Sequence, residues 1–218
     1  MNLVFLGPPG SGKGTQAARL SAARHVVHLS TGDVLREAVR KGTPLGKKAE
    51  AYMTRGELVP DALIIGLIED KISAGELRNG FILDGFPRTI PQAESLKEML
   101  ARHNMNLDRA ILFSVPEEEL VKRLSGRWHC PKCNAGYNYP LALPKVAGQC
   151  DKDKEPLQRR PDDEEAVVRN RLVVYRTQTR PIEDFYRRES VLTEIQGNQL
   201  PDSVFAALLK VTDNVGAL

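Results

Sequence analysis

The residues Gly7-Pro8-Pro9-Gly10-Ser11-Gly12-Lys13 have the G-x-x-x-x-G-K spacing of a phosphate-binding loop. Glycines let backbone N–H groups converge on phosphate oxygens, and the helix expected next adds partial positive charge at its N-terminus. Lys13 supplies a point charge for the β- and γ-phosphates. The alternative is an ordinary glycine-rich turn. If the segment is a phosphate-binding loop, we expect a nucleotide to contact Gly10, Ser11, Gly12, Lys13, Gly14 and Thr15.

The position after Lys13 departs from the general pattern of these loops. It holds Gly14, and the hydroxyl of Thr15 comes one place later than the hydroxyl that usually holds Mg²⁺. We therefore expect Mg²⁺ to be held through substrate phosphates and water. Asp84, at the end of an apolar run, has the place of the acid that assists this metal. Its alternative role is to cap a turn at a strand end.

Three cysteines lie in one short region and predict a metal site. Cys130 and Cys133 form one C-x-x-C half-site, and Cys150 with Asp153 repeats its spacing with a carboxylate in the last place. Four protein ligands would make a closed, structural zinc site. His129 competes with Asp153 as the fourth ligand, and unliganded cysteines are the other alternative. An odd cysteine count argues against a disulfide framework and favours a reducing compartment.

Short apolar runs and turn residues predict the elements that position these groups. Strands are expected at 3–6, 26–29, 81–84, 109–115 and 191–195. Helices are expected at 15–24, from a cap at Ser30 or Thr31 to near Gly42, from a cap at Asp61 to Gly75, from 116 to Gly126, from Asp162 onward with a break at Pro181, and at 201–211. This alternation indicates an α/β fold with a parallel sheet covered on both faces.

The composition is that of an ordinary globular chain. Its 218 residues are 41% hydrophobic and 27% charged, with a formal net charge of +3. So small a surplus does not indicate a nucleic-acid or membrane surface. No apolar run is long enough to span a bilayer, and the first residues lack the charge of a signal peptide. From 127 to 161 the helical pattern stops, which predicts a small inserted subdomain.

The run Phe81-Ile82-Leu83-Asp84-Gly85-Phe86-Pro87-Arg88-Thr89, together with 10–16 and 30–33, resembles the adenylate kinase family in its longer, bacterial form. The resemblance implies a P-loop kinase core with a parallel five-stranded sheet at 1–29, 60–126 and 164–218. It also implies a nucleoside monophosphate (NMP) binding subdomain at 30–59 and a lid at 127–163. The implied reaction is ATP + AMP ⇌ 2 ADP with Mg²⁺, in a cytoplasmic monomer that maintains adenine nucleotides.

The resemblance also carries residue roles. Charge stabilisation falls to Lys13 with Arg36, Arg88, Arg123, Arg127, Arg160 and Arg171, and Asp84 assists the metal. AMP is read by Thr31, Glu57, Leu58, Val59, Gly85, Phe86, Pro87, Arg88 and Gln92, together with Arg36, Arg160 and Arg171. ATP is contacted by Gly136, Tyr137, Gln199, Arg123 and Arg127 in addition to the loop. Arginine suits this task because its fork matches phosphate geometry and stays charged.

Two other classes of protein fit parts of the sequence. A hydrolysing or switching P-loop NTPase fits the loop alone, but no N-K-x-D tetrapeptide is present. A zinc-ribbon nucleic-acid module fits the cysteines with Lys132, Lys145 and Arg159-Arg160, although neighbouring acids dilute that charge. We expect Arg159, Arg169 and Arg176 to be structural or solvent-facing, and His25, His28 and His103 to be packing or surface residues.

Overall fold

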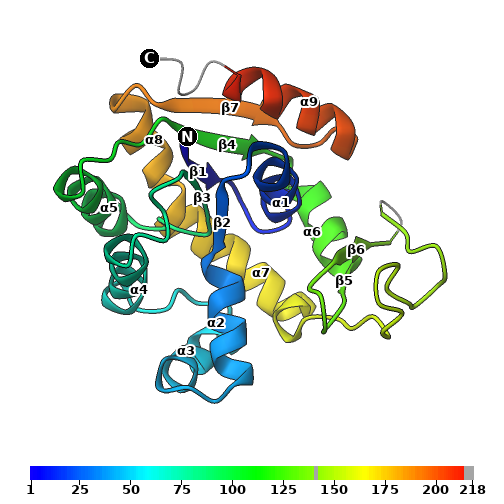
Figure 1. The fold of residues 1–218 in the computed structure, drawn as a ribbon. Helices are drawn as coiled ribbons and strands as arrows, with labels where there is room; N and C mark the ends of the chain where they lie inside the picture. The colour runs from blue at the N-terminus through cyan, green and yellow to red at the C-terminus, as the bar shows by residue number, and fades with distance from the viewer. Residues whose placement is uncertain (140–141, 214–218) are drawn as a thin grey trace.

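The structure is a computed structural model that describes residues 1–139 and 142–213 (Figure 1). The first half of the chain forms β1 (Asn2–Leu6), α1 (Lys13–Arg24), β2 (Val27–Ser30), α2 (Thr31–Arg40), α3 (Pro44–Arg55), α4 (Asp61–Ser73), β3 (Phe81–Asp84) and α5 (Ile90–Arg102). The second half forms β4 (Arg109–Ser114), α6 (Glu117–Ser125), β5 (Arg127–His129), β6 (Gly136–Asn138), the 3₁₀ turn η1 (Pro161–Asp163), α7 (Glu165–Val174), the π-helical turn η2 (Tyr175–Thr179), α8 (Pro181–Arg188), β7 (Leu192–Gln196) and α9 (Pro201–Thr212).

Five parallel strands form the central sheet in the order β2-β3-β1-β4-β7. The predicted α/β fold with a parallel five-stranded sheet is therefore confirmed. The register pairs Phe5 with Asp84 and Ser30 with Asp84. Because parallel strands all end at one edge, the loop after β1 and the turn after β3 lie side by side at that edge, where open α/β sheets bind their ligands.

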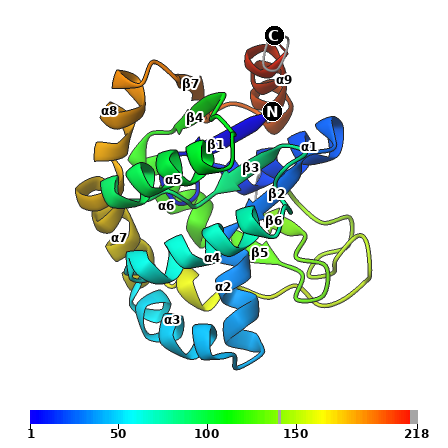
Figure 2. The ribbon, with the colours of Figure 1, turned by 60° about the vertical axis from the view of Figure 1, so that its left-hand side comes forward.

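Helices cover both faces of the sheet (Figure 2). Alternate residues of each strand face opposite ways, so Leu3 and Phe5 pack with α1 and α9, whereas Val4 and Leu6 pack with α4, α5 and α8. Both strand faces are apolar, which is why the strands appear in the sequence as continuous apolar runs rather than alternating ones.

Several element boundaries differ from the sequence predictions. Helix α1 begins at Lys13 because Gly12 adopts φ 91° as its N-cap, which lets the helix start directly after the loop. Helix α3 was not predicted, although Thr43 followed by proline is a helix-start signal; the Thr43 hydroxyl accepts from Gly46 N at 3.1 Å. Asp61 does not cap α4: the N-cap is Pro60, and the Asp61 carboxylate turns to other partners.

The segment between α6 and η1 forms a layer of its own beside the sheet (Figures 1 and 2). Its β5 and β6 pair antiparallel, and a bridge joins His129 to Gln158. A separate small cluster of Cys130, Tyr137, Cys150 and Leu157 fills its interior. Among the described residues, no helix combines the length and apolarity that a membrane span requires.

Candidate active site

The loop between β1 and α1 has the shape of a phosphate cradle. Gly7 adopts φ 135°, and a Cβ there would lie 2.7 Å from the Phe113 carbonyl, so only glycine fits this turn. The Lys13 ammonium folds over the loop and donates to the carbonyls of Gly7 at 2.6 Å and Pro8 at 2.9 Å. Burial lowers the pKa of Lys13 to about 8, against the opposing charge of Asp84.

Asp84 lies at the end of β3, against this loop. A Cβ on Gly14 would lie 3.2 Å from its Oδ2 atom, so the carboxylate faces the first turn of α1. Burial alone would raise the pKa of Asp84, but the neighbouring His28 ring and Lys13 ammonium outweigh it, and the pKa lies below the usual value. Asp84 is therefore an anion close to the place where nucleotide phosphates would lie. The Lys13 ammonium and the Asp84 carboxylate thus both lie at the phosphate loop.

His28 packs beside a charged group, which the prediction of a packing or surface residue did not specify. Its Nε2 atom lies 3.6 Å from Asp84 Oδ2 and is buried without a hydrogen-bond partner among the described residues. The contact follows from the strand order of the folded sheet, because β2 and β3 pair in parallel with Ser30 opposite Asp84.

An open pocket with about 610 Å³ of empty space adjoins the turn after β3. Residues from α2, α3, the α3–α4 connection, α4, the turn after β3, α5, η1 and α7 line it: Thr31, Gly32, Leu35, Arg36, Met53, Gly56, Glu57, Leu58, Val59, Ile64, Gly85, Arg88, Gln92, Asp162 and Arg171. Most of the residues predicted to read AMP are thus brought together. Phe86, Pro87 and Arg160 are exceptions: none of them lines the pocket, and the first two are buried.

Gln92 lies in this pocket with its amide already oriented. The Nε2 atom donates to Asp61 Oδ1 at 2.7 Å, and Oε1 accepts from the Arg88 backbone N–H at 2.8 Å. Thr89 adds a hydrogen bond to the other Asp61 oxygen at 2.9 Å. An amide has two N–H donors and two acceptor lone pairs, so one of each stays free to meet a ligand. Asp61 does not itself line the pocket but lies behind Gln92, and no role at this site was predicted for it.

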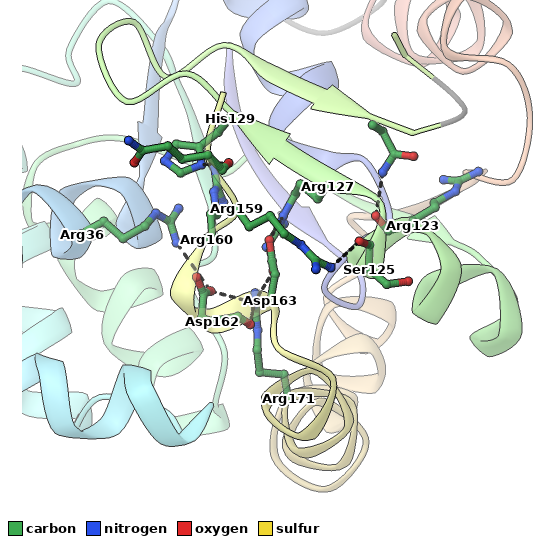
Figure 3. A network of polar contacts seen from close by, with 12 residues as sticks. Arg36, Arg123, Ser125, Arg127, His129, Arg159, Arg160, Asp162, Asp163 and Arg171 are labelled. Carbon is green, nitrogen blue, oxygen red and sulfur yellow. Dashed lines mark hydrogen bonds and ion pairs between the residues drawn. The ribbon is translucent and has the colours of Figure 1, made fainter. Parts of the chain in front are cut away.

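Arginines and carboxylates form a network at the same edge (Figure 3). The Asp162 carboxylate lies 2.7 Å from Arg171 Nη1 and 3.9 Å from Arg36 Nη1. Asp33 lies 2.5 Å from Arg36 Nη2 and 3.8 Å from Arg160 Nη2. Segments distant in sequence, α2, η1 and α7, thereby direct their charges to one place.

A third carboxylate, that of Asp163, pairs with an arginine at the start of β5. Asp163 has a fully buried side chain, accepts from Arg127 Nε at 2.6 Å, and lies 3.4 Å from Arg171 Nη1. Burial and neighbouring arginines lower the pKa of Arg171 and Arg160 to about 10, which leaves both charged at neutral pH. The network therefore holds several cations that are paired with carboxylates and a backbone carbonyl of the same chain. Such cations can accept phosphate oxygens in exchange.

Arg88 and Arg123 are the remaining arginines of the set predicted to bind phosphate, and they lie on other elements, the turn after β3 and helix α6. Arg88 Nε donates to the Gly85 carbonyl at 2.7 Å, beside the pocket. Arg123 lies apart from the pocket arginines in Figure 3, and its Nη1 donates to the Gly197 carbonyl at 2.9 Å. As predicted, Arg159 has a structural contact, here with the Ser125 carbonyl at 2.6 Å.

The cysteines form the expected cluster. Cys130 Sγ lies 3.2 Å from Asp153 Oδ1, Cys133 Sγ lies 3.6 Å from Cys150 Sγ, and all four ligand atoms fall within 4.8 Å of one another. The edge of a zinc–thiolate tetrahedron is about 3.8 Å, from Zn–S bonds of about 2.3 Å. The thiols are free and the donor set is soft, so the residues fit a divalent metal. His129 lies outside the cluster, with Nδ1 2.9 Å from the Gln158 carbonyl.

Comparison with known proteins agrees with this geometry. A family model described as adenylate kinase matches residues 5–191. An adenylate kinase of Thermodesulfovibrio yellowstonii is 47% identical over 98% of this chain and 99% of its own length. One from Archaeoglobus fulgidus is 47% identical over 99% of each chain, and one from Methanocella arvoryzae is 50% identical over 94% and 95%. The chain belongs to the adenylate kinase family.

Membership of this family determines the reaction that the protein catalyses. The protein is a nucleoside monophosphate kinase that transfers a phosphoryl group between ATP and AMP. Adenylate kinases use Mg²⁺ with ATP, and they bind ATP, AMP and ADP.

The remaining residues that were predicted to contact ATP lie in β6 and in the loop after β7. Gly136 is exposed on β6, but the Tyr137 side chain turns inward: its hydroxyl accepts from Asp151 N at 2.7 Å and lies 3.5 Å from Cys150 Sγ. The Tyr137 side chain is therefore engaged within the layer and does not face a nucleotide site. Gln199 is exposed in the loop after β7, which packs on the phosphate loop at Gly197.

Proposed function

We propose that AMP binds in the pocket beside Gln92 while ATP binds on the phosphate loop, with the transferred group between them. The observation that carries this assignment is the shared turn after β3. Asp84 at its start lies against the phosphate loop, and Arg88 at its end lines the pocket. One short segment thus contacts both sites, as direct transfer between two nucleotides requires.

The base of AMP is read by the Gln92 amide. Its free N–H and free lone pair match the acceptor and donor of an adenine edge, the bidentate pairing that glutamine makes with adenine elsewhere. Thr31, Gly85 and the backbone of Glu57, Leu58 and Val59 enclose the base and ribose. Phe86 and Pro87 contribute by shaping the turn that presents Gly85 and Arg88.

Catalysis is positioning and charge stabilisation. Phosphoryl transfer needs in-line geometry and positive charge around the equatorial oxygens. Arg36, Arg88 and Arg171 bind the AMP phosphate, and Lys13, Arg123 and Arg127 bind the ATP phosphates. Arg160 joins them at the transferred group. Arg36, Arg127, Arg160 and Arg171 exchange carboxylate partners for phosphate oxygens, so these cations need little rearrangement when substrates arrive.

The chain divides into a core at 1–29, 60–126 and 164–218, an NMP-binding subdomain at 30–59 and a lid at 127–163. Closing the lid excludes water, so that phosphate goes to AMP and is not lost by hydrolysis. The separate interior of the 127–160 layer supports a part that moves as one body. ATP hydrolysis without an acceptor should therefore be far slower than transfer; comparable rates would contradict this assignment.

Two metals belong to the proposal. Mg²⁺ would neutralise part of the charge on the ATP phosphates. Asp84 lies beside the phosphate loop to assist it through water, because position 14 lacks a hydroxyl. Zinc is the ion that we assign to Cys130, Cys133, Cys150 and Asp153. Four protein ligands make that site structural, and it stabilises a lid whose apolar interior is small.

Both nucleotide sites are built from one chain, so the proposed enzyme acts as a monomer. Reduced cysteines arranged for a metal support a cytoplasmic location. The arginines face carboxylates and the nucleotide sites, which supports small nucleotides as partners, with no nucleic acid and no membrane.

An acceptor assay tests the proposal. The enzyme is given MgATP with AMP, CMP, UMP or GMP, and diphosphate formation is measured. AMP should be the preferred acceptor, and Lys13→Ala should lose the activity. A preference for a pyrimidine acceptor would contradict the Gln92 assignment, and a Lys13→Ala enzyme of normal rate would contradict the ATP site.

A further inference from the structure

The loop 197–200, between β7 and α9, is fastened to other elements at both ends. At its start, the Gly197 carbonyl accepts from Arg123 Nη1 at 2.9 Å. Beyond its end, the Pro201 carbonyl accepts from Gln16 Nε2 at 2.9 Å and from Arg19 Nη1 at 3.1 Å. These hydrogen bonds fix the position of the loop 197–200 relative to the phosphate loop.

Gln16 is an unusual residue to bury at this place. It lies in the first turn of α1, close after Lys13, and only 3% of it is exposed. Its Oε1 atom is buried without a hydrogen-bond partner among the described residues. A buried unpaired carbonyl is destabilising, and methionine would fill a similar volume without that cost. What the amide adds is the bond to the Pro201 carbonyl.

The loop offers acceptors toward solvent. In the described parts of the chain, no backbone N–H donates to the carbonyl of Asn198 or Gln199, and both residues are exposed. A free carbonyl can accept from the N6 amino group of adenine. It repels guanine, which has the O6 acceptor at that position. The position of these carbonyls therefore bears on the choice between ATP and GTP.

We propose that Gln16 is a positioning residue for the adenine of ATP. Its amide holds the Pro201 carbonyl, and through it the loop 197–200, where the free carbonyls meet the base. The inference rests on the proposed binding of ATP at the phosphate loop with its base at Gln199. It predicts that Gln16 governs ATP affinity and purine selectivity without contacting phosphate.

The test compares the unsubstituted enzyme with Gln16→Met. The KM for ATP should rise about three- to tenfold, the effect of one weakened hydrogen bond. The ratio of kcat/KM for ATP to that for GTP should fall by a similar factor. The KM for AMP should stay the same, kcat should stay within about twofold, and the melting temperature should not fall, because a buried unpaired carbonyl has been removed.

Arg24→Met is the matched control, since Arg24 pairs with Asp213 between the same two helices but away from the loop. It should leave the KM for ATP and the purine ratio unchanged. An active Gln16→Met enzyme with unchanged ATP constants would overturn this inference alone. Equal rises in the KM for ATP and AMP, or an equal effect of Arg24→Met, would also overturn it by indicating a general structural role. Failure of the unsubstituted enzyme to phosphorylate AMP would instead contradict the proposed function.

Discussion

The Nη1 atom of Arg171 lies 2.7 Å from Oδ2 of Asp162, within the pocket assigned to AMP. Both side chains are largely buried, so the pair is shielded from solvent and salt. A guanidinium that is already oriented and desolvated has little left to lose when a phosphate replaces the carboxylate. We therefore expect Asp162 to keep Arg171 in place before the substrate arrives and to compete with the substrate for the same cation.

Asp162→Asn should have opposite effects on binding and stability. Removing the competing anion should lower the dissociation constant of AMP about three- to tenfold, as expected for one charge in a partly buried site. The melting temperature should fall, because Arg171 loses its buried partner. In a small domain each 1 kcal/mol of lost stability lowers the melting temperature by about 4–8 °C, and in this larger chain the fall per kcal/mol is smaller. Calorimetry of AMP binding and thermal unfolding measure the two effects.

Glu165→Gln provides the control for Asp162→Asn, since Glu165 pairs with Arg169 on the exposed side of α7. It should change neither quantity appreciably, as exposed pairs contribute little. Weaker AMP binding by Asp162→Asn would show that Asp162 assists the substrate, and would contradict the competition described above.

Asp61→Ala should affect AMP alone. Without Asp61 Oδ1, the Gln92 amide loses the partner at 2.7 Å that fixes which end donates to the base. The KM for AMP should rise several-fold and discrimination against other monophosphates should weaken, while the KM for ATP stays constant. Steady-state kinetics with each substrate varied in turn give the result. A rise in the KM for ATP would place the role of Asp61 elsewhere.

The pKa of Lys13, lowered to about 8 by burial, predicts a pH dependence. The ammonium is present below pH 8, so kcat/KM for ATP should fall as the pH rises above about 8. The fall should be absent from kcat at saturating ATP, since bound phosphate holds the proton on Lys13. Lys13→Arg, although less active, should lose this basic limb. An unchanged limb in that variant would assign the titration to another group.

The same shift has a consequence for stability with a definite sign. Between pH 8 and the ordinary value of 10.5, the unfolded chain keeps the Lys13 proton that the folded chain releases. The contribution of Lys13 to the free energy of unfolding therefore rises with pH in that window. Denaturant titrations at pH 8 and pH 10 should show a smaller rise for Lys13→Met than for the unsubstituted enzyme. An equal rise in both would assign it to other groups.

Removal of the lid metal should lower stability and spare the chemistry. Elemental analysis should find zinc, and stripping it should lower the melting temperature by at least about 5 °C. The rate at low temperature should change little, because the cluster lies outside the nucleotide sites. Asp153→Ala should weaken zinc retention and His129→Ala should not. An apo-enzyme that keeps its melting temperature but loses turnover would contradict a structural role.

Local patterns were enough to predict much of this molecule. The phosphate loop and the apolar strands follow from spacing and continuous burial, which neighbouring residues alone encode. The pairing of Cys150 with Asp153 also follows from a repeated spacing. Helix α3 was missed although its Thr43 cap was visible, because its apolar stripe is short.

Relations across long separations were not predictable in this way. The hydrogen bond from Gln92 Nε2 to Asp61 Oδ1 joins the starts of α5 and α4, so it depends on how these two helices pack against each other. The inward turn of Tyr137 depends on the cysteine cluster beneath it rather than on strand alternation. The carboxylate partners of the arginines also come from packing, because charged residues are common and sequence alone does not say which of them meet.

The binding of a bisubstrate dinucleotide, two adenosines joined through five phosphates, tests the central claim most directly. If ATP and AMP occupy adjoining sites at one sheet edge, this compound should bind at least about a hundredfold more tightly than ATP, through effective concentration at the second site. Arg88→Met and Lys13→Met should each remove most of that gain. A dinucleotide that binds no better than ATP alone would contradict the account.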